Sequence, residues 1–259
     1  MKNNTALITG ASGGIGMELA RIHAKKGGNL VLVARSEGKL NDLAEELKAA
    51  HSVEVTVIAA DLAKAEAAQQ IFERTEQQGI AVDVLINNAG FGGHGIFHEQ
   101  ELAGQLDMMQ VNMTTLTALT HHYLPGMVER KHGRILNVSS TASFMPGPLQ
   151  AVYYATKAFV TSFTQALAEE LSGTGVTTTA LCPGPVMTGF ADAANLDGVE
   201  AFDKGKSAES VAAIGYKAME KGKLVIINEA GLSFILNWVT PFLPRRTVLK
   251  LSRRFMEKS

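Results

Sequence analysis

The chain has 259 residues, of which 46% are hydrophobic and 19% charged, enough for one large core and a single domain over 1–259. Its 24 Lys and Arg against 25 Asp and Glu leave no basic field for a polyanion, so we expect no nucleic acid partner. The lone cysteine, Cys182, suits a reducing compartment. Without a leader pattern or an apolar run of roughly 20 residues, we expect no transmembrane segment and a cytoplasmic location.

Seven short runs of apolar and β-branched residues predict seven strands, with helical patterns between them. Such nearly continuous runs are typical of strands covered on both faces. The pattern predicts an α/β fold, a single-domain Rossmann-type doubly wound parallel sheet flanked by helices. The runs lie at 5–9, 29–34, 53–59, 82–87, 134–138, 176–181 and 223–227.

A glycine-rich stretch, TGASGGIG, follows the first run, with Gly10, Gly14 and Gly16 after Thr9. Glycines here let the backbone turn tightly and approach a pyrophosphate at a helix N-terminus. A simple turn would also explain the glycines. Their place between a strand and an amphipathic helix favours a dinucleotide site.

The second run ends in ARSEGK, with no carboxylate at the tip, where an NAD site usually has one. Arg35, with Ser36 and Lys39 nearby, would instead accept the extra phosphate of NADP(H). Arg35 could also be a solvated residue that begins a helix. Its position favours the phosphate role and predicts NADP(H) as the cofactor.

The Gly-x3-Gly-x-Gly spacing resembles that of the short-chain dehydrogenase/reductase (SDR) family, and further motifs follow in order over about 190 residues. These are Asp61, NNAG at 87–90, Asn112 in VNM, NVSS at 137–140, Tyr153-x3-Lys157 and PGPVMT at 183–188. The resemblance implies an oxidoreductase acting on CH-OH or C=O groups. It further implies cofactor contacts from Gly10, Ser12, Gly14, Ile15, Gly16, Asp61, Leu62, Asn88, Ala89, Gly90, Tyr153, Lys157, Pro183, Gly184, Val186 and Thr188.

Two adjacent tyrosines precede Lys157, and helical spacing lets either share its face. The family motif selects Tyr153 over Tyr154 as the proton donor and Ser140 over Ser139 as its partner. Lys157 is expected to lower the pKa of the Tyr153 phenol and to bind the ribose. Asn112, the fourth catalytic residue by resemblance, would hold a helix distortion and a water.

The predicted reaction is hydride transfer between NADP(H) and a small-molecule carbonyl or secondary alcohol, as in a carbonyl reductase. An apolar ketone or aldehyde is expected if aromatic and methionine side chains line the site, although these could equally pack into the core. They are Phe91, Phe97, Phe144, Met145, Met187 and Phe190. The alternative function is a non-catalytic NADP(H)-binding module that senses redox state.

Two pairs of histidines could be considered as metal ligands. His94 and His98 are four residues apart, but neighbouring glycines indicate a loop and no third ligand is evident. His121 and His122 are adjacent and cannot easily face one ion. We therefore assign no metal.

The remaining segments suggest a substrate lid, a C-terminal tail and a contact between copies of the chain. Residues 188–206 are a candidate substrate lid, and 231–259 form a C-terminal helical tail whose end, 243–259, we expect to be dispensable for turnover. The basic tail favours a solvated helix on its own domain, with peripheral membrane contact as the weaker reading. Helical stretches 102–128 and 152–171 are apolar on several faces and predict a homodimer or homotetramer.

Overall fold

All seven predicted strands form one parallel sheet in the computed structural model, which describes residues 4–199 and 205–258. The sheet order is β3-β2-β1-β4-β5-β6-β9, and every neighbouring pair is parallel. The fold prediction is confirmed. The strands are β1 (Thr5–Thr9), β2 (Asn29–Ala34), β3 (Val55–Ala59), β4 (Val84–Asn87), β5 (Gly133–Val138), β6 (Val176–Cys182) and β9 (Val225–Ile227).

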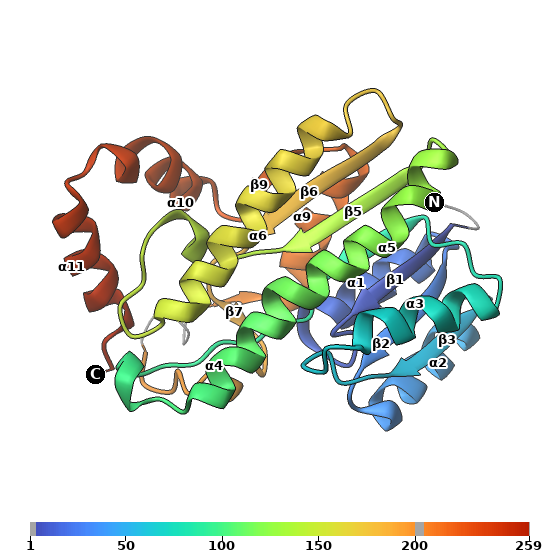
Figure 1. The fold of residues 1–259 in the computed structure, drawn as a ribbon, viewed down its shortest axis with the longest axis horizontal. Helices are drawn as coiled ribbons and strands as arrows, with labels where there is room; N and C mark the ends of the chain where they lie inside the picture. The colour runs from blue at the N-terminus through green and yellow to red at the C-terminus, as the bar shows by residue number, and fades with distance from the viewer. Residues whose placement is uncertain (1–3, 200–204, 259) are drawn as a thin grey trace.

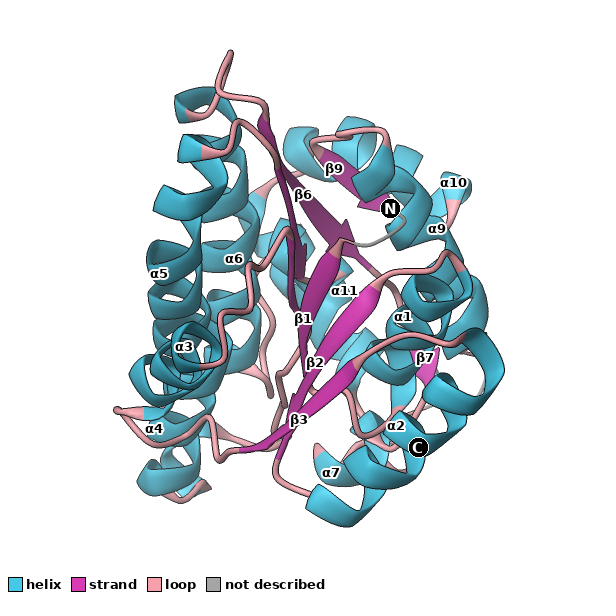
Figure 2. Ribbon diagram, turned by 90° about the vertical axis from the view of Figure 1, so that its right-hand side faces the viewer, coloured by secondary structure: helices cyan, strands magenta, loops and turns pink. Residues whose placement is uncertain are grey.

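Helices cover both faces of the sheet (Figure 1). One layer holds α1 (Gly14–Lys25), α2 (Glu37–His51) and α9 (Ala208–Glu220). Figure 2 shows the opposite layer, which contains α3 (Ala67–Gln77), α4 (Leu102–Met109), α5 (Leu116–Glu129) and α6 (Ala151–Glu170). Parallel strands need such crossover helices, which explains why the strand runs alternate with helical patterns.

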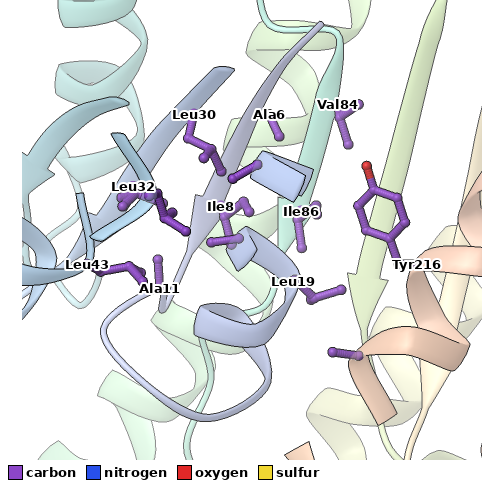
Figure 3. Close-up of a cluster of buried hydrophobic side chains, with 14 of the residues drawn as sticks. Ala6, Ile8, Ala11, Leu19, Leu30, Leu32, Leu43, Val84, Ile86 and Tyr216 are labelled. Atoms are coloured by element: carbon purple, nitrogen blue, oxygen red, sulfur yellow. The ribbon is translucent and has the colours of Figure 1, made fainter. Parts of the chain in front are cut away.

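The core fills the space on both sides of the sheet. Alternate residues of one strand point to opposite faces, so Ile8 packs toward α1 whereas Leu7 packs toward α3 and α5. Figure 3 shows the first of these clusters, which includes Leu19 of α1 and Tyr216 of α9. Because both faces are buried, most residues of both sets are apolar.

A buried polar ladder crosses the centre of the sheet at the carboxyl ends of β4 and β5. Asn87 pairs with Asn137 in the strand register, and its Nδ2 donates to Asn137 Oδ1 at 2.9 Å and to Thr120 Oγ1 at 3.1 Å. Asn137 Nδ2 donates to Thr164 Oγ1 at 2.9 Å. The ladder therefore ties the middle strands to both α5 and α6, which lie in the same helical layer.

Two shorter regions follow β6. The strands β7 (Val186–Met187) and β8 (Lys206–Ser207) pair with each other, and the short helix α7 (Phe190–Ala193) lies in the predicted lid, whose residues 200–204 fall outside the described residues. The C-terminal segment contains α10 (Ala230–Phe234), the π-helix η4 (Ile235–Val239), the 3-10 turn η5 (Thr240–Phe242) and α11 (Arg245–Met256). Across residues 4–199 and 205–258, every helix is too short or too polar to span a bilayer.

Candidate active site

A cavity of about 590 Å³ lies where segments leave the carboxyl ends of β1, β2, β4, β5 and β6. The strand order changes direction between β1 and β4, and open α/β sheets bind ligands in the crevice at this point. Residues of the glycine-rich turn and of α6 line the same cavity. The structure thus brings the predicted cofactor turn together with the predicted proton-donor segment.

The glycine-rich turn is locked against the segment that follows β4. Thr9 Oγ1 accepts hydrogen bonds from the backbone N–H groups of Asn88 and Ala89, each at 3.0 Å. Asn88 Nδ2 donates to the carbonyl oxygens of Thr9 at 2.9 Å and Gly10 at 3.2 Å. These hydrogen bonds join the two segments into one unit beneath the cavity.

Glycine is required at several points of this unit. Gly10 and Gly14 adopt φ of +66° and +54°, which residues with a Cβ rarely adopt. A Cβ on Gly16 would lie 2.4 Å from the Gly10 carbonyl oxygen, and one on Gly90 would lie 3.0 Å from Asn112 Oδ1. A cradle lined by bare backbone at a helix N-terminus fits the pyrophosphate of a dinucleotide.

Tyr153 of α6 is buried in the cavity wall, and burial raises the pKa of its phenol above the ordinary value, while the nearby Ser140 hydroxyl lowers it in part. Ser140 begins a 3-10 turn (Thr141–Phe144) after β5, and its Oγ accepts a hydrogen bond from Ala142 N at 3.1 Å. The turn fixes the serine hydroxyl at the cavity wall. Tyr153 is therefore protonated at neutral pH.

Lys157 lies one helical turn beyond Tyr153. Its Nζ donates to the Val138 carbonyl oxygen at 2.8 Å and lies 5.8 Å from the centre of the Tyr153 ring. Burial lowers the pKa of this ammonium to about 8. The expectation that Lys157 holds the pKa of Tyr153 below its usual value is not met, because burial of the phenol outweighs the other influences.

The second serine and the second tyrosine have visible packing roles. Ser139 Oγ donates to the Lys157 carbonyl oxygen at 2.9 Å and contacts Thr161 Oγ1 at 2.7 Å, which joins the end of β5 to α6. The Tyr154 ring packs on Gly147, where a Cβ would lie 2.2 Å from the ring. Both residues nevertheless line the cavity.

Asn112 lies behind the cavity wall in a π-helical segment, Gln110–Thr115, between α4 and α5. Its Oδ1 accepts from the backbone N–H of Phe91 at 3.1 Å, and its Nδ2 donates to Phe91 O at 3.0 Å and Thr156 Oγ1 at 3.1 Å. The expected helix distortion is present. The side chain holds Phe91 and α6 in place and is not part of the cavity lining.

Most residues predicted to bind the cofactor line the cavity. They are Gly10, Ser12, Gly14, Ile15, Arg35, Lys39, Asn88, Ala89, Gly90, Tyr153, Lys157, Pro183, Gly184, Val186 and Thr188. Gly16 packs beneath the turn, and Ser36 precedes α2 outside the lining. Asp61 caps its own turn by accepting from Ala63 N at 3.1 Å, whereas Leu62 is buried with its carbonyl oxygen bound to Thr115.

Fewer aromatic and methionine side chains line the cavity than the sequence predicts. Of the six apolar candidates only Phe91 and Phe190 line the cavity. Phe97 and Met187 are exposed. Phe144 and Met145 pack beside Leu236, and Met145 also packs against the cluster of Tyr153 and Tyr154 without lining the cavity.

The C-terminal tail reaches the cavity and does not form an outer surface alone, while its dispensability for turnover stays a prediction. Phe255 and Met256 of α11 line the cavity, and the Met256 carbonyl oxygen lies 2.7 Å from His94 Nε2. The Met256 side chain packs with Leu196 and Val199 from the lid region. No motif marks these two residues, and only the apolar stripe of the tail could have suggested that it packs inward.

Comparison with known proteins agrees with this arrangement. The family model described as short chain dehydrogenase matches residues 4–198. A short chain dehydrogenase of Pseudocercospora fijiensis is 35% identical over 188 residues, covering 72% of this chain and 60% of that protein. A very-long-chain 3-oxoacyl-CoA reductase of Anas platyrhynchos is 33% identical over 253 residues, covering 95% of this chain and 78% of that protein.

Solved structures give the same result. A short-chain dehydrogenase from Sphingobium yanoikuyae in complex with NADPH superimposes with a TM-score of 0.82 at 30% identity, covering 92% of each chain. A short-chain dehydrogenase/reductase from Burkholderia phymatum in complex with NAD gives a TM-score of 0.83 at 26% identity, covering 100% of this chain and 98% of the other. The family match over residues 4–198, together with the parallel sheet, the glycine cradle and the Tyr153–Lys157 pair, shows that this chain belongs to the short-chain dehydrogenase family.

Proposed function

We propose that the protein is an NADP(H)-dependent oxidoreductase that reduces an apolar ketone or aldehyde to a secondary or primary alcohol. The observation that carries the proposal is the buried Tyr153 phenol, held beside Ser140 in the wall of a cavity whose floor is a dinucleotide cradle. A phenol that stays protonated at neutral pH suits a general acid for carbonyl reduction.

The residues divide the work as follows. Tyr153 donates its proton to the carbonyl oxygen, and Ser140 holds that oxygen by a hydrogen bond as negative charge develops on it. Lys157 would bind the cofactor ribose through its ammonium, and Asn112 positions Phe91 and α6. NADPH supplies the hydride when bound, while the glycine cradle and the segment Pro183–Thr188 hold its two ends.

An apolar substrate is supported by two observations. Phe91, Phe190, Phe255 and Met256 line the cavity, and a pocket of this kind favours an apolar carbonyl compound. A neighbouring solved structure is that of a 7β-hydroxysteroid dehydrogenase, at 28% identity and a TM-score of 0.84, and relatives are named as 3-oxoacyl-CoA reductases.

The experiment that tests the function is NADPH oxidation, followed by absorbance, across a panel of apolar and polar ketones and aldehydes. We expect turnover of apolar members and a higher Michaelis constant for polar ones. Cofactor binding without turnover of any member would instead favour a redox-sensing module.

Cofactor preference is tested at Arg35, which follows β2 directly and lines the cavity together with Lys39 of α2. A charge-assisted contact to a phosphate is worth about 1.5–3 kcal/mol, so Arg35→Ala should raise the Michaelis constant for NADPH at least tenfold. The constant for NADH should change little. Steady-state kinetics with both cofactors measure this, and Arg74→Ala, an exposed arginine of α3, is the matched control. Equal losses with both cofactors would contradict the phosphate contact.

The pH profile tests Lys157. Its pKa of about 8 means that the ammonium is present below that pH and is lost as the pH rises through it. We therefore expect kcat/KM for NADPH to be level below about pH 8 and to fall up to tenfold per pH unit above it. Lys39→Ala should keep the inflection, because Lys39 is a separate, exposed cation. A profile that stays level to pH 9.5 would show that cofactor binding does not use this ammonium.

We further propose that two copies pair through α4, α5 and α6. These helices expose apolar side chains that a partner would cover. The residues are Leu102, Leu106, Met109, Val128 and Phe159.

A further inference from the structure

The segment from α10 to η5 turns large aromatic side chains away from the domain. Phe234, Trp238 and Phe242 are four residues apart and are 61%, 68% and 80% exposed. Ile235 and Val239 of the same segment are exposed as well. Leu232 and Leu236, from the other side, pack against the end of β6 and β9. The segment is therefore apolar on both sides, and only its inner side is covered.

Helix α11, which follows directly, adds positive charge to this surface. Residues 243–258 contain six Lys and Arg and a single carboxylate, Glu257, although the whole chain has a net charge of −1. Glu257 pairs with Arg253 at 3.1 Å. Within residues 4–199 and 205–258, no ion pair involves Arg245, Arg246 or Lys250. The remainder of the chain is correspondingly acidic, so the charge is polarised toward this end.

Helix α11 separates an inner face from an outer one. Val248, Ser252 and Met256 are buried, whereas Leu251 and Phe255 are exposed among the cations. Figure 1 shows α10 and α11 together at the edge of the molecule, on the side away from β2 and β3. We call residues 230–258 the C-terminal platform.

We propose that the C-terminal platform docks onto the surface of an anionic lipid bilayer. Exposed aromatic side chains next to clustered Arg and Lys match the two halves of a membrane interface, its apolar boundary and its negative headgroups. A second copy of the chain fits this surface less well, because two such platforms placed face to face would bring like charges together. The contact is peripheral, since no described helix could cross the bilayer.

The platform also borders the candidate active site, and this part of the inference rests on the proposed function. Phe255 is 57% exposed and also lines the cavity. Met256, its neighbour, is buried in the cavity wall. Docking would place the edge of the cavity at the interface, where an apolar carbonyl compound dissolves. The substrate class that follows is a membrane-dissolved ketone or aldehyde.

The test uses the full chain with vesicles of phosphatidylcholine alone or with 30% phosphatidylserine. We expect sedimentation with the anionic vesicles, weakened at 0.5 M salt, which screens exposed charges. Trp238 is the only tryptophan, so its emission should shift to the blue on docking and should be quenched by brominated lipid. Unchanged emission and no sedimentation would overturn the proposal.

Matched variants locate the contact. Arg245→Glu/Arg246→Glu and Trp238→Ala should each lower the partition coefficient at least tenfold. Lys221→Glu/Lys223→Glu and Leu224→Ala, exposed at the far end of β9, should leave it unchanged. Equal losses in both sets would show that binding follows overall charge and would overturn the assignment to the platform.

Two further readouts separate the remaining outcomes. Light scattering measures the mass in solution, and a multimer that Trp238→Ala dissociates would make the platform an interface between copies. Turnover is compared for one apolar ketone in anionic vesicles and one water-soluble ketone. Vesicles should raise the rate only for the first, and an equal rate without vesicles would overturn substrate uptake from the bilayer. Docking without turnover of either ketone would count against the proposed function and leave the platform supported.

Discussion

Tyr153→Phe should lower turnover of an apolar ketone by about 10²- to 10⁴-fold, the usual contribution of a positioned general acid. The substitution removes the phenol hydroxyl beside Ser140 and keeps the ring that Phe190 contacts at 5.5 Å between centroids. The fold and the cradle are untouched, so the dissociation constant for NADPH should change little. Single-turnover kinetics and fluorescence titration with NADPH measure the two quantities separately.

Tyr154→Phe is the matched control, because this neighbouring tyrosine is equally buried. Its hydroxyl lies near Ser252 of α11, whose Oγ has no hydrogen-bond partner among the described residues, so its loss should cost at most about 1 kcal/mol of stability and at most a few-fold in turnover. An active Tyr153→Phe protein beside an inactive Tyr154→Phe protein would contradict the assignment of the proton donor and of Ser140 with it.

Gly16→Ala should lower the free energy of unfolding by about 1–3 kcal/mol, as overpacking of a tight contact usually does. A Cβ at this position lies 2.4 Å from the Gly10 carbonyl oxygen and 2.4 Å from Asn88 Nδ2. The Gly10 carbonyl oxygen cannot move easily because it is part of the backbone. Asn88 Nδ2 cannot move easily because it donates hydrogen bonds to the carbonyl oxygens of Thr9 and Gly10. The turn must open, so NADPH binding should weaken at least tenfold as well. Thermal unfolding and fluorescence titration measure both effects.

Gly38→Ala provides the comparison. Gly38 also lies in the first turn of a helix, α2, but a Cβ there has nothing within 4 Å. Alanine in a helix is favoured over glycine by roughly 0.5–1 kcal/mol, so this variant should be as stable as the parent or slightly more stable. An unfolding temperature of Gly16→Ala equal to that of the parent protein would contradict the close packing of the turn on Asn88.

The sheet could be predicted from the sequence because each strand carries its own signal. Buried parallel strands need apolar side chains on both faces, so runs such as 29–34 stand out without reference to the rest of the chain. Predicted strand ends differ from the observed ones by at most two residues, as for β3, which begins at Val55.

Those residues of the candidate site were predictable whose type is determined by local backbone conformation or by helical spacing. Gly10 must adopt a positive φ, and Tyr153 and Lys157 must share a helix face. The contribution of Phe255 and Met256 was not predictable, because it depends on where α11 folds back and no nearby residue encodes that path. The raised pKa of Tyr153 was not predictable either, because burial is a property of the folded environment and not of the spacing between Tyr153 and Lys157.

The amide ladder across β4 and β5 has a consequence for folding. Strands that are apolar on both faces can slide past one another with little penalty, since any register buries similar side chains. A slip of one residue between β4 and β5 would break the hydrogen bond from Asn87 Nδ2 to Asn137 Oδ1, and a buried polar group left without a partner costs about 1–3 kcal/mol. The ladder therefore disfavours misaligned pairing of β4 with β5 and selects the register in which Asn87 lies opposite Asn137.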